Sequence, residues 1–208
     1  MSETLLREQW RVLRAWLDEV EILRYADRPT GLGEWSVSDL VAHLGLGLGM
    51  LTEITPAEPD AEPMSFGRYV GHYPPAAEAI AANTRDLAAE LDGDLLAGLD
   101  RIAAEAFAAI EDVTWPVVLG RRGPLGYPDY LRTRLLELVV HGDDLARAVP
   151  EAGSSPVLAE AAESVAATLA GAYAEVAGAG QRHGGEAMAW IRAATGRIPS
   201  DDVHLPLL

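Results

Sequence analysis

Residues 135–145 constrain the fold most, because they place ionisable side chains in an otherwise apolar segment of helical character. Glu137 and His141 are four residues apart, so on a helix they lie on the same face, one turn from each other. Their neighbours are leucine and valine, which indicates that this face points inward. Unpaired buried polar groups are costly, so the two side chains need a common partner. A divalent metal ion is such a partner, and His43 on another expected helix is the natural third ligand.

The composition favours a helical fold. Hydrophobic residues make up 49% of the 208 residues but aromatic residues only 6%, so the core depends mainly on leucine, valine and alanine. Long segments of Ala, Leu, Glu and Arg have high helix propensity, and no segment is a convincing strand. No apolar run is long enough to span a membrane, and the N-terminus lacks the pattern of a signal peptide. We therefore expect a soluble cytoplasmic protein.

Missing residue types and the net charge exclude several functions. The chain has no cysteine, and all 16 basic residues are arginine, which excludes disulfides, cysteine nucleophiles, lysine Schiff bases and the phosphate-loop lysine. The formal net charge of −16 repels nucleic-acid phosphates and anionic lipids. We expect a small-molecule substrate and neither a nucleic-acid nor a membrane partner.

The spacing of apolar residues predicts the order of the elements. Helices are expected over residues 4–25, from Val37 to about Leu51 with Ser36 and Asp39 as a capping box, over 76–112 with a break near 92–94, from Pro128 to about Val149, over 157–176 and over 186–194. Residues 55–75 are interpreted as a long loop that can act as a lid, and residues 114–124 as a turn-rich connector. The predicted fold is all-α: an antiparallel four-helix bundle with long crossover connections and a short extra C-terminal helix. Residues 1–150 would form a metal-binding bundle, and residues 151–208 a helical extension packed on it, within a single domain.

Each candidate ligand also has a structural interpretation. A lone histidine on an apolar face, such as His43, is more often a hydrogen-bonded core residue than a ligand. Glu137 can form an ion pair with Arg134, three residues earlier. Asp144 shares a face with His141 and is either a fourth ligand or, more plausibly, the carboxylate that orients the histidine ring. Its neighbour Asp143 is expected to be a surface acid.

Other polar and small residues give weaker signals. Of the three glycines Gly45, Gly47 and Gly49, the first and last share one helix face, which indicates either close helix packing or an open wall for a ligand. The histidines His72, His183 and His204 have no partners at metal-ligand spacing; the last two are expected to be solvated, and His72 can approach the mouth of the site. The arginines Arg121, Arg122, Arg192 and Arg197 either bind an anionic substrate or form solvated surface.

Two motifs resemble a known family. Residues 35–44, with Trp35, Val37, Asp39 and His43, are similar to the W-x-V-x-D-L-x-x-H-L signature of the DinB-like superfamily. Residues 137–145 are similar to the E-x-x-x-H-x-x-D-L signature of the branch that contains the mycothiol-dependent maleylpyruvate isomerases. The resemblance covers roughly the first 150 residues. It implies a four-helix bundle that holds a divalent metal, usually zinc, through His43, Glu137 and His141, with an open position for water or a thiol.

The resemblance also implies a chemistry. In the isomerases a low-molecular-weight thiol adds to a cis double bond, and rotation and elimination give the trans isomer. The isomerase branch carries a further α/β domain, whereas the residues after Pro150 in this chain are expected to be helical. Residues 189–197 resemble a W-x-x-G-R-like segment of many relatives, which implies that Arg197 reaches the substrate or the thiol. Without the α/β domain, the resemblance leaves the substrate open.

The expected function is therefore a thiol-dependent isomerase or transferase in which a metal activates a mycothiol-type thiol, with Asp144 and Arg197 assisting. The alternatives are a metal-dependent hydrolase using metal-bound water and a non-catalytic metal-containing binding module. Zinc is the first choice of metal, but two nitrogens and one carboxylate also suit nickel or iron. A homodimer through the apolar faces of the bundle is plausible.

Overall fold

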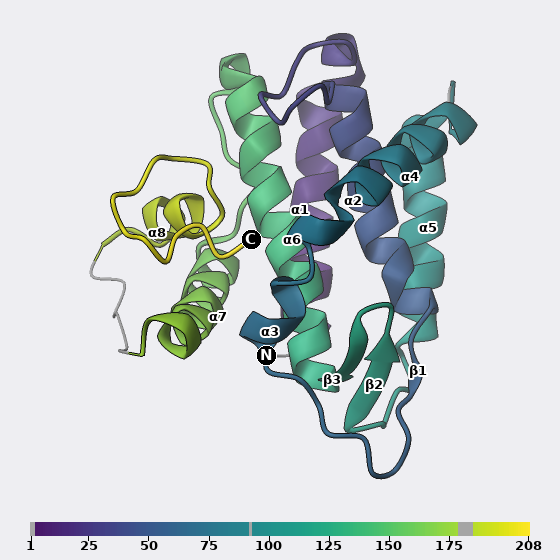
Figure 1. Cartoon of the computed structure of the whole chain (residues 1–208). Helices are drawn as coiled ribbons and strands as arrows, with labels where there is room; N and C mark the ends of the chain where they lie inside the picture. The colour runs from purple at the N-terminus through teal and green to yellow at the C-terminus, as the bar shows by residue number, and fades with distance from the viewer. Residues whose placement is uncertain (1–2, 92, 179–184) are drawn as a thin grey trace.

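Four long helices pack side by side around the core of this computed structural model, which describes residues 3–91, 93–178 and 185–208 (Figure 1). They are α1 (Glu3–Glu19), α2 (Val37–Gly49), α5 (Leu95–Ala109) and α6 (Tyr127–Ala148). Helix α2 packs against α5 and α6, and α1 packs against α6. An ion pair of 2.7 Å between Arg14 and Asp100 links α1 to α5. The predicted helical bundle is confirmed.

Helix α2 begins where the sequence predicts. The hydroxyl of Ser36 accepts a hydrogen bond from the backbone N–H of Asp39, and the Asp39 carboxylate accepts one from the backbone N–H of Ser36 at 2.9 Å. These two bonds satisfy donors that the first turn of a helix otherwise leaves free. The predicted capping box is confirmed, and it fixes the start of the helix that carries His43.

The glycines of α2 have different surroundings, and at Gly45 the first of the two alternatives, close helix packing, is confirmed. A Cβ added at Gly45 would lie 3.1 Å from Leu99 and 3.4 Å from Ile102, so this glycine permits close packing against α5. At Gly47, by contrast, the nearest atom to an added Cβ would be the Cβ of Glu137, at 3.8 Å. The glycine-rich helix therefore packs tightly on one side and leaves room beside Glu137 on the other.

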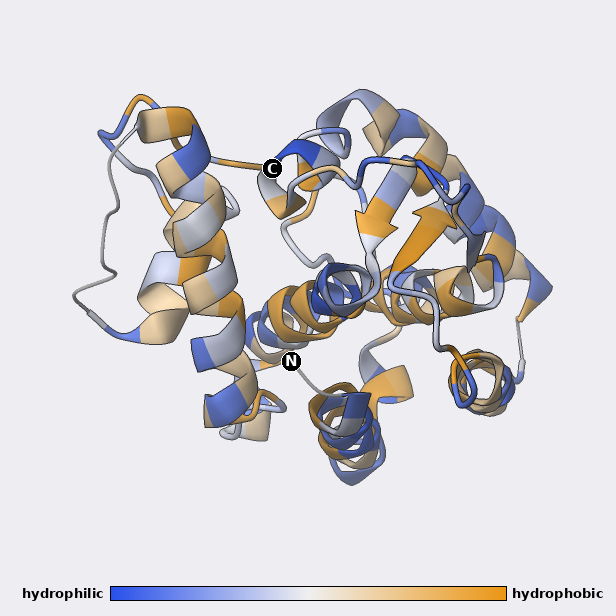
Figure 2. Cartoon of the chain, turned by 90° about the horizontal axis from the view of Figure 1, so that it is seen from below, coloured by the Kyte–Doolittle hydropathy of each residue, from blue (hydrophilic) through white to orange (hydrophobic). Residues whose placement is uncertain are grey.

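Helix α6 lies at the centre of the fold. Pro128 occupies its first turn, as predicted, where a missing backbone N–H has no consequence. The helix has buried residues along most of its length, and Leu135 and Val139 are fully buried. Viewed along the bundle, apolar and polar residues alternate around the helices (Figure 2), as expected of amphipathic helices around a shared core.

The prediction that no strand forms is wrong. Three short strands, β1 (Thr55–Pro56), β2 (Val117–Gly120) and β3 (Gly123–Gly126), form an antiparallel sheet in the order β1-β2-β3 at one end of the bundle (Figure 1). Val118 pairs with both Pro56 and Leu125, and Val118 and Leu125 are fully buried. Each strand is too short to give a periodic signal, and the sheet depends on pairing between residues far apart in sequence. The hairpin turn places Arg121 and Arg122 next to each other between β2 and β3.

Within the described residues, four 3-10 helices, one short α-helix and the 14-residue helix α4 lie in the long connections. They are the 3-10 helices η1 (Ile22–Tyr25), η2 (Met50–Thr52), η3 (Pro74–Ala76) and η4 (Pro150–Ala152), and the α-helices α3 (Phe66–Val70) and α4 (Ala77–Glu90). The expected loop over residues 55–75 therefore contains β1 and α3. The predicted break near residues 92–94 separates α4 from α5, and Gly93 there has a φ of +84°; Asp92 lies outside the described residues. Helix α4 packs across α2.

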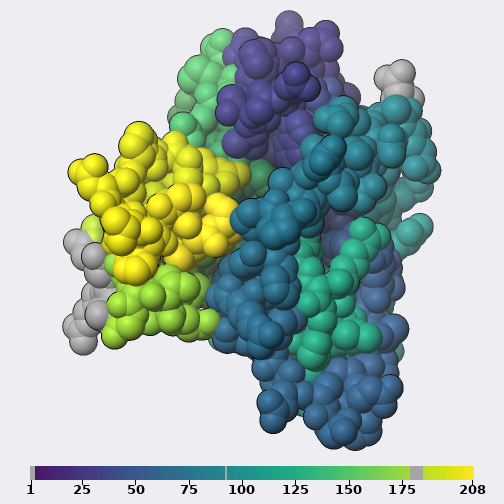
Figure 3. Space-filling model, in the orientation of Figure 1, coloured from purple at the N-terminus to yellow at the C-terminus, as the bar shows by residue number. Residues whose placement is uncertain are grey.

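The C-terminal residues form two further helices, α7 (Ala159–Ala177) and α8 (Ala187–Ala194). Helix α7 packs against α6, α3 and α8, and the last residues lie against the segment around α4 (Figure 3). Gly178 ends α7, and residues 179–184, which follow it, lie outside the described residues. The division into a bundle over residues 1–150 and a packed extension over residues 151–208 stays a prediction. No described helix is long and apolar enough to cross a membrane.

Replacing Ser36 with alanine should lower the free energy of unfolding by about 1 kcal/mol, because the variant loses the side-chain acceptor of the capping box. The matched control is Ser164→Ala in α7, whose hydroxyl makes no hydrogen bond within the described part of the chain. That variant should stay within about 0.5 kcal/mol of the wild type in urea unfolding. Equal effects of the two substitutions would contradict the role given to the cap.

Candidate metal centre and adjoining cavity

The three predicted ligands converge between α2 and α6. The Nε2 atom of His43 lies 3.4 Å from Oε2 of Glu137, and Nε2 of His141 lies 3.2 Å from the same oxygen. One candidate ligand atom from each residue lies within 4.8 Å of the others. His43 and His141 are buried, and the Glu137 side chain is 14% exposed. The spacing of four residues on α6 and the packing of α2 against that helix together bring the three groups to one point.

This donor set fits a divalent metal ion. Zinc binds histidine nitrogen and carboxylate oxygen at about 2.0–2.1 Å, so neighbouring ligand atoms around a tetrahedral ion lie about 3.3 Å apart. The two observed separations from the Glu137 oxygen, 3.2 and 3.4 Å, match that spacing. Two imidazoles and one carboxylate also suit nickel and iron. Three protein ligands would leave a coordination position open, which is the arrangement of catalytic rather than structural sites.

Each imidazole is held by a second hydrogen bond on its far side. The Nδ1 atom of His43 lies 3.1 Å from the Thr84 hydroxyl of α4, and Nδ1 of His141 lies 3.0 Å from Oδ2 of Asp144. In a metal-bound form both Nδ1 atoms would carry the proton, so that the Nε2 atoms, which here lie against Glu137, would present their lone pairs to the ion. Asp144 thus has the geometry of a residue that orients a ligand and not of a fourth ligand. Thr84, which is fully buried, was not predicted, because no motif links it to His43 41 residues away.

The charges of the cluster are strongly coupled. Burial acts to raise the pKa of Glu137, but hydrogen bonds from His141 and His43 hold that pKa well below its usual value. Burial opposes a charge on His141, whereas its bonds to Asp144 and Glu137 raise its pKa. The pKa of His43 is lowered, chiefly by burial. Glu137 is therefore an anion despite its burial, as a ligand carboxylate must be.

Arg134 does not form the ion pair with Glu137 that was considered as an alternative. Its Nη1 donates to the backbone oxygen of Gly47 at 2.9 Å, and its Nη2 donates to the Tyr73 hydroxyl at 3.0 Å. Its Nε donates to the Thr133 hydroxyl at 3.0 Å. The guanidinium is therefore turned toward α2 and the loop before α4, and the Glu137 carboxylate contacts the two histidines instead.

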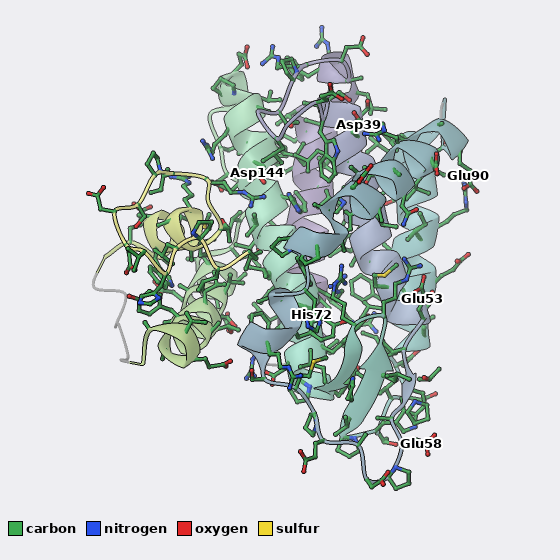
Figure 4. All side chains as sticks on the ribbon, viewed as in Figure 1. Asp39, Glu53, Glu58, His72, Glu90 and Asp144 are labelled. Carbon is green, nitrogen blue, oxygen red and sulfur yellow. The ribbon has the colours of Figure 1, made fainter. Side chains whose placement is uncertain are left out.

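Two ion pairs attach the C-terminal segment to α6. Arg192 of α8 binds Asp143 through two hydrogen bonds of 2.6 and 2.8 Å, and Arg197 binds Asp144 at 3.0 Å. Asp143 is 5% exposed, so the expectation of a surface acid is wrong; α8 covers it and supplies its counter-ion. Figure 4 shows Asp144 on the side of α6 that faces this segment. Arg197 also donates to the Thr195 backbone oxygen, which orients its guanidinium. The same side chain thus binds Asp144 and forms part of the lining of the cavity described below.

A cavity of about 310 Å³ opens beside the three candidate ligands, which form part of its lining. Its apolar wall comes from α2, α4 and α6 and includes Leu46, Ile80 and Val140. The Trp35 ring lies 4.7 Å from the His43 ring and closes one side. The polar part of the lining includes Tyr73, Arg122 and Arg134. Sequence reasoning placed Trp35 in a family signature without a role at the site, and Tyr73, an aromatic residue in a loop, carried no spacing signal.

Of the remaining histidines, the two that the structure describes neither join the cluster nor line the cavity. His72 is exposed after α3 and is not among the described residues that line the cavity (Figure 4). His204 is exposed, as expected, and its ring lies 6.1 Å from that of Tyr173. His183 lies outside the described residues.

Comparison with protein-family models matches residues 6–146 to the mycothiol maleylpyruvate isomerase N-terminal domain. The matched range contains both signatures and all three candidate ligands, and it ends before α7. Searches among curated proteins and solved structures gave no match.

Replacing Thr84 with valine should weaken zinc binding by about tenfold or more, because His43 loses the partner that fixes its ring orientation. Valine has the same shape as threonine, so the packing of α4 on α2 should be kept. The control is Thr168→Val on α7, which removes a hydroxyl that donates to a backbone oxygen and lies in another helix. Competition against a chromogenic chelator measures both affinities, and equal affinities would contradict a positioning role for Thr84.

Replacing Asp144 with asparagine should weaken zinc binding about 10- to 100-fold, because the amide holds His141 less firmly and lacks the negative charge that makes the imidazole a stronger electron donor. Asp143→Asn, which breaks the neighbouring ion pair to Arg192, should lower the melting temperature and leave zinc affinity near that of the wild type. If Asp143→Asn weakened zinc binding as much as Asp144→Asn, the effect would belong to the docking of the C-terminal segment and not to His141.

Proposed function

The chain belongs to the mycothiol maleylpyruvate isomerase N-terminal domain family, and from its site we propose that it is a metal- and thiol-dependent isomerase or transferase acting on a small electrophilic substrate. The observation that carries the proposal is the convergence of His43, Glu137 and His141 at the wall of a cavity large enough for a small molecule. We further propose zinc as the metal, a mycothiol-type thiol as the co-substrate and a cytoplasmic location.

Bound at this centre, a divalent metal would lower the pKa of a thiol so that the thiolate forms near neutral pH. The chain supplies no thiol of its own, since it has no cysteine, so the nucleophile has to enter with a co-substrate. An isomerisation would then consist of sulfur adding to one carbon of a cis double bond, rotation about the resulting single bond, and elimination that releases the thiol unchanged.

The protein's own residues would set the geometry for this chemistry. Thr84 and Asp144 hold the two imidazoles, and Arg197 holds Asp144 in turn. The apolar wall and Trp35 would leave a bound substrate in largely apolar surroundings, which strengthens electrostatic interactions with it. In this scheme Asp144 and Arg197 are positioning residues, because each acts on the centre through another side chain.

Two features of the site argue against the alternatives. A hydrolase would need a base free to take a proton from water, but Asp144 is engaged by both His141 and Arg197. A closed structural site would have four protein ligands, whereas three residues form the cluster found within the described parts of the chain. A homodimer stays a prediction, as does the absence of nucleic-acid partners, which the net charge of −16 favours.

The test is to strip the purified protein with a chelator, reload it with zinc and titrate mycothiol by calorimetry. We expect about one zinc per chain, thiol binding to the zinc-loaded protein alone, and turnover of members of a panel of activated alkenes and other electrophiles in the presence of the thiol. His141→Ala should lose most of the zinc, while His204→Ala, at an exposed site, should retain it. Loaded wild-type protein that neither binds the thiol nor turns over the panel would overturn the proposal, as would ester hydrolysis in thiol-free buffer at a rate that thiol does not change.

A further inference from the structure

Two arginines face the cavity without a carboxylate partner. Most arginines within the described ranges form ion pairs, and those that do not include Arg68, Arg85 and Arg147, which are exposed. Arg122 and Arg134 differ from these because they are at least partly buried and both line the cavity. In a chain with 32 acidic residues against 16 basic ones, a buried arginine without an acidic partner is unexpected. Burying a charge is costly unless a counter-ion compensates it, so these two side chains are suited to an anion that comes from outside.

Arg134 is almost fully buried, with 4% exposure. Its three hydrogen bonds to Gly47, Thr133 and Tyr73 orient the guanidinium and use one N–H from each nitrogen. A guanidinium has five N–H groups, so one remains on each terminal nitrogen. Burial acts to lower the pKa of Arg134, and the nearby tyrosines and the charge of Glu137, one turn further along α6, raise it, but that carboxylate is already shared between the two histidines.

Arg122 lies on the turn between β2 and β3 and lines the cavity from that turn. Its guanidinium carbon lies 4.3 Å from the centre of the Tyr73 ring, a cation–π contact that fixes the plane of the group. Its Nε atom is buried and has no hydrogen-bond partner within the described parts of the chain. A buried donor left without an acceptor costs about 1–3 kcal/mol, which a bound acceptor would recover.

Tyr73 connects the two arginines. Its ring lies under Arg122, and its hydroxyl oxygen accepts from Arg134 at 3.0 Å. Burial raises the pKa of Tyr73, so the phenol stays protonated. No acceptor for its own proton exists among the described residues, which leaves the O–H free to donate to a ligand. A phenol and two guanidinium groups thus present N–H and O–H donors at one part of the cavity lining.

We infer that Arg122, Arg134 and Tyr73 form a carboxylate-binding subsite that holds the acid group of the electrophilic substrate, an inference that rests on the proposed function. Guanidinium groups bind carboxylates through paired, charge-assisted hydrogen bonds. The cavity of about 310 Å³ lies at the small end of ligand pockets, and its wall of Leu46, Ile80 and Val140 is apolar. The ligand is therefore a short organic acid whose body is hydrocarbon, not a sugar or a nucleotide.

The position of Arg134 relative to the candidate centre supports this assignment. Arg134 and Glu137 are three residues apart on α6, which is a rise of about 4.5 Å along the helix. A carboxylate at the subsite would place the next few carbons of the same molecule beside His43, Glu137 and His141. Binding energy from a group that does not react would thus orient the group that does.

Binding of crotonate, a short unsaturated carboxylate, tests the subsite, with the neutral crotonamide and inorganic phosphate as comparison probes. In calorimetry with the zinc-loaded protein, crotonate should bind, crotonamide should bind at least about tenfold more weakly, and phosphate should not compete. Arg122→Met and Tyr73→Phe should each weaken crotonate binding about tenfold while zinc content stays at the wild-type level. Both side chains are less buried than Arg134, so these variants avoid the risk of misfolding that Arg134→Met carries.

The matched control is Arg121→Met in the same turn, which removes the same charge from a side chain that two hydrogen bonds of 2.6 Å hold to Glu53. It should leave crotonate binding within about twofold of the wild type. Crotonate binding that is unchanged in both Arg122→Met and Tyr73→Phe would overturn the inference, because the carboxylate would then be held elsewhere, for example by the metal. Tighter binding of phosphate than of crotonate would overturn the assignment to carboxylates.

These results separate the subsite from the proposed function. Wild-type protein that binds zinc and mycothiol but not crotonate would overturn the subsite and leave the thiol-dependent function standing. Crotonate binding that depends on Arg122 in a protein that binds no thiol would support the subsite and overturn the function.

Discussion

A buried, ionised Glu137 between two imidazoles is the interaction on which the site depends. A carboxylate in this position is unfavourable by itself, and hydrogen bonds from His43 and His141 keep it charged. His141 reaches it from one turn away on the same helix, and His43 reaches it from α2, where Gly47 leaves space beside Glu137 and Gly45 permits close packing against α5. One side of α2 thus packs against apolar side chains of α5, and the other side borders the cluster of Glu137 and the two histidines.

The sequence predicted the parts of the structure that depend on regular spacing. Glu137 and His141 are separated by one helical turn, and Asp144 follows on the same face, so their mutual placement required only that residues 127–148 be helical. The capping box at Ser36 was predictable for the same reason. The approach of His43 from α2 did not follow from spacing: His43 was proposed as a histidine on the apolar face of another helix, and the resemblance of two motifs then implied the same ligand.

Contacts between residues far apart in sequence could not be predicted in this way. Thr84 meets His43 because α4 crosses α2, and the sheet forms because β1 meets a hairpin more than 60 residues later. Asp143 was assigned to the surface because nothing in its neighbourhood revealed that α8 would cover it. Arg134 was considered only as a partner of Glu137, and its actual partner Tyr73 lies in a segment without periodicity. In each case the missing information was tertiary.

The ion pair between Arg197 and Asp144 has a consequence for where the functional unit ends. The family match stops at residue 146, yet the charge that fixes Asp144, and through it His141, is supplied 51 residues later. A fragment trimmed to the matched range would keep all three ligand side chains and lose the guanidinium that steadies one of them. The boundary drawn by sequence similarity and the boundary of the electrostatic network therefore differ, and the histidine at the centre belongs to the longer unit.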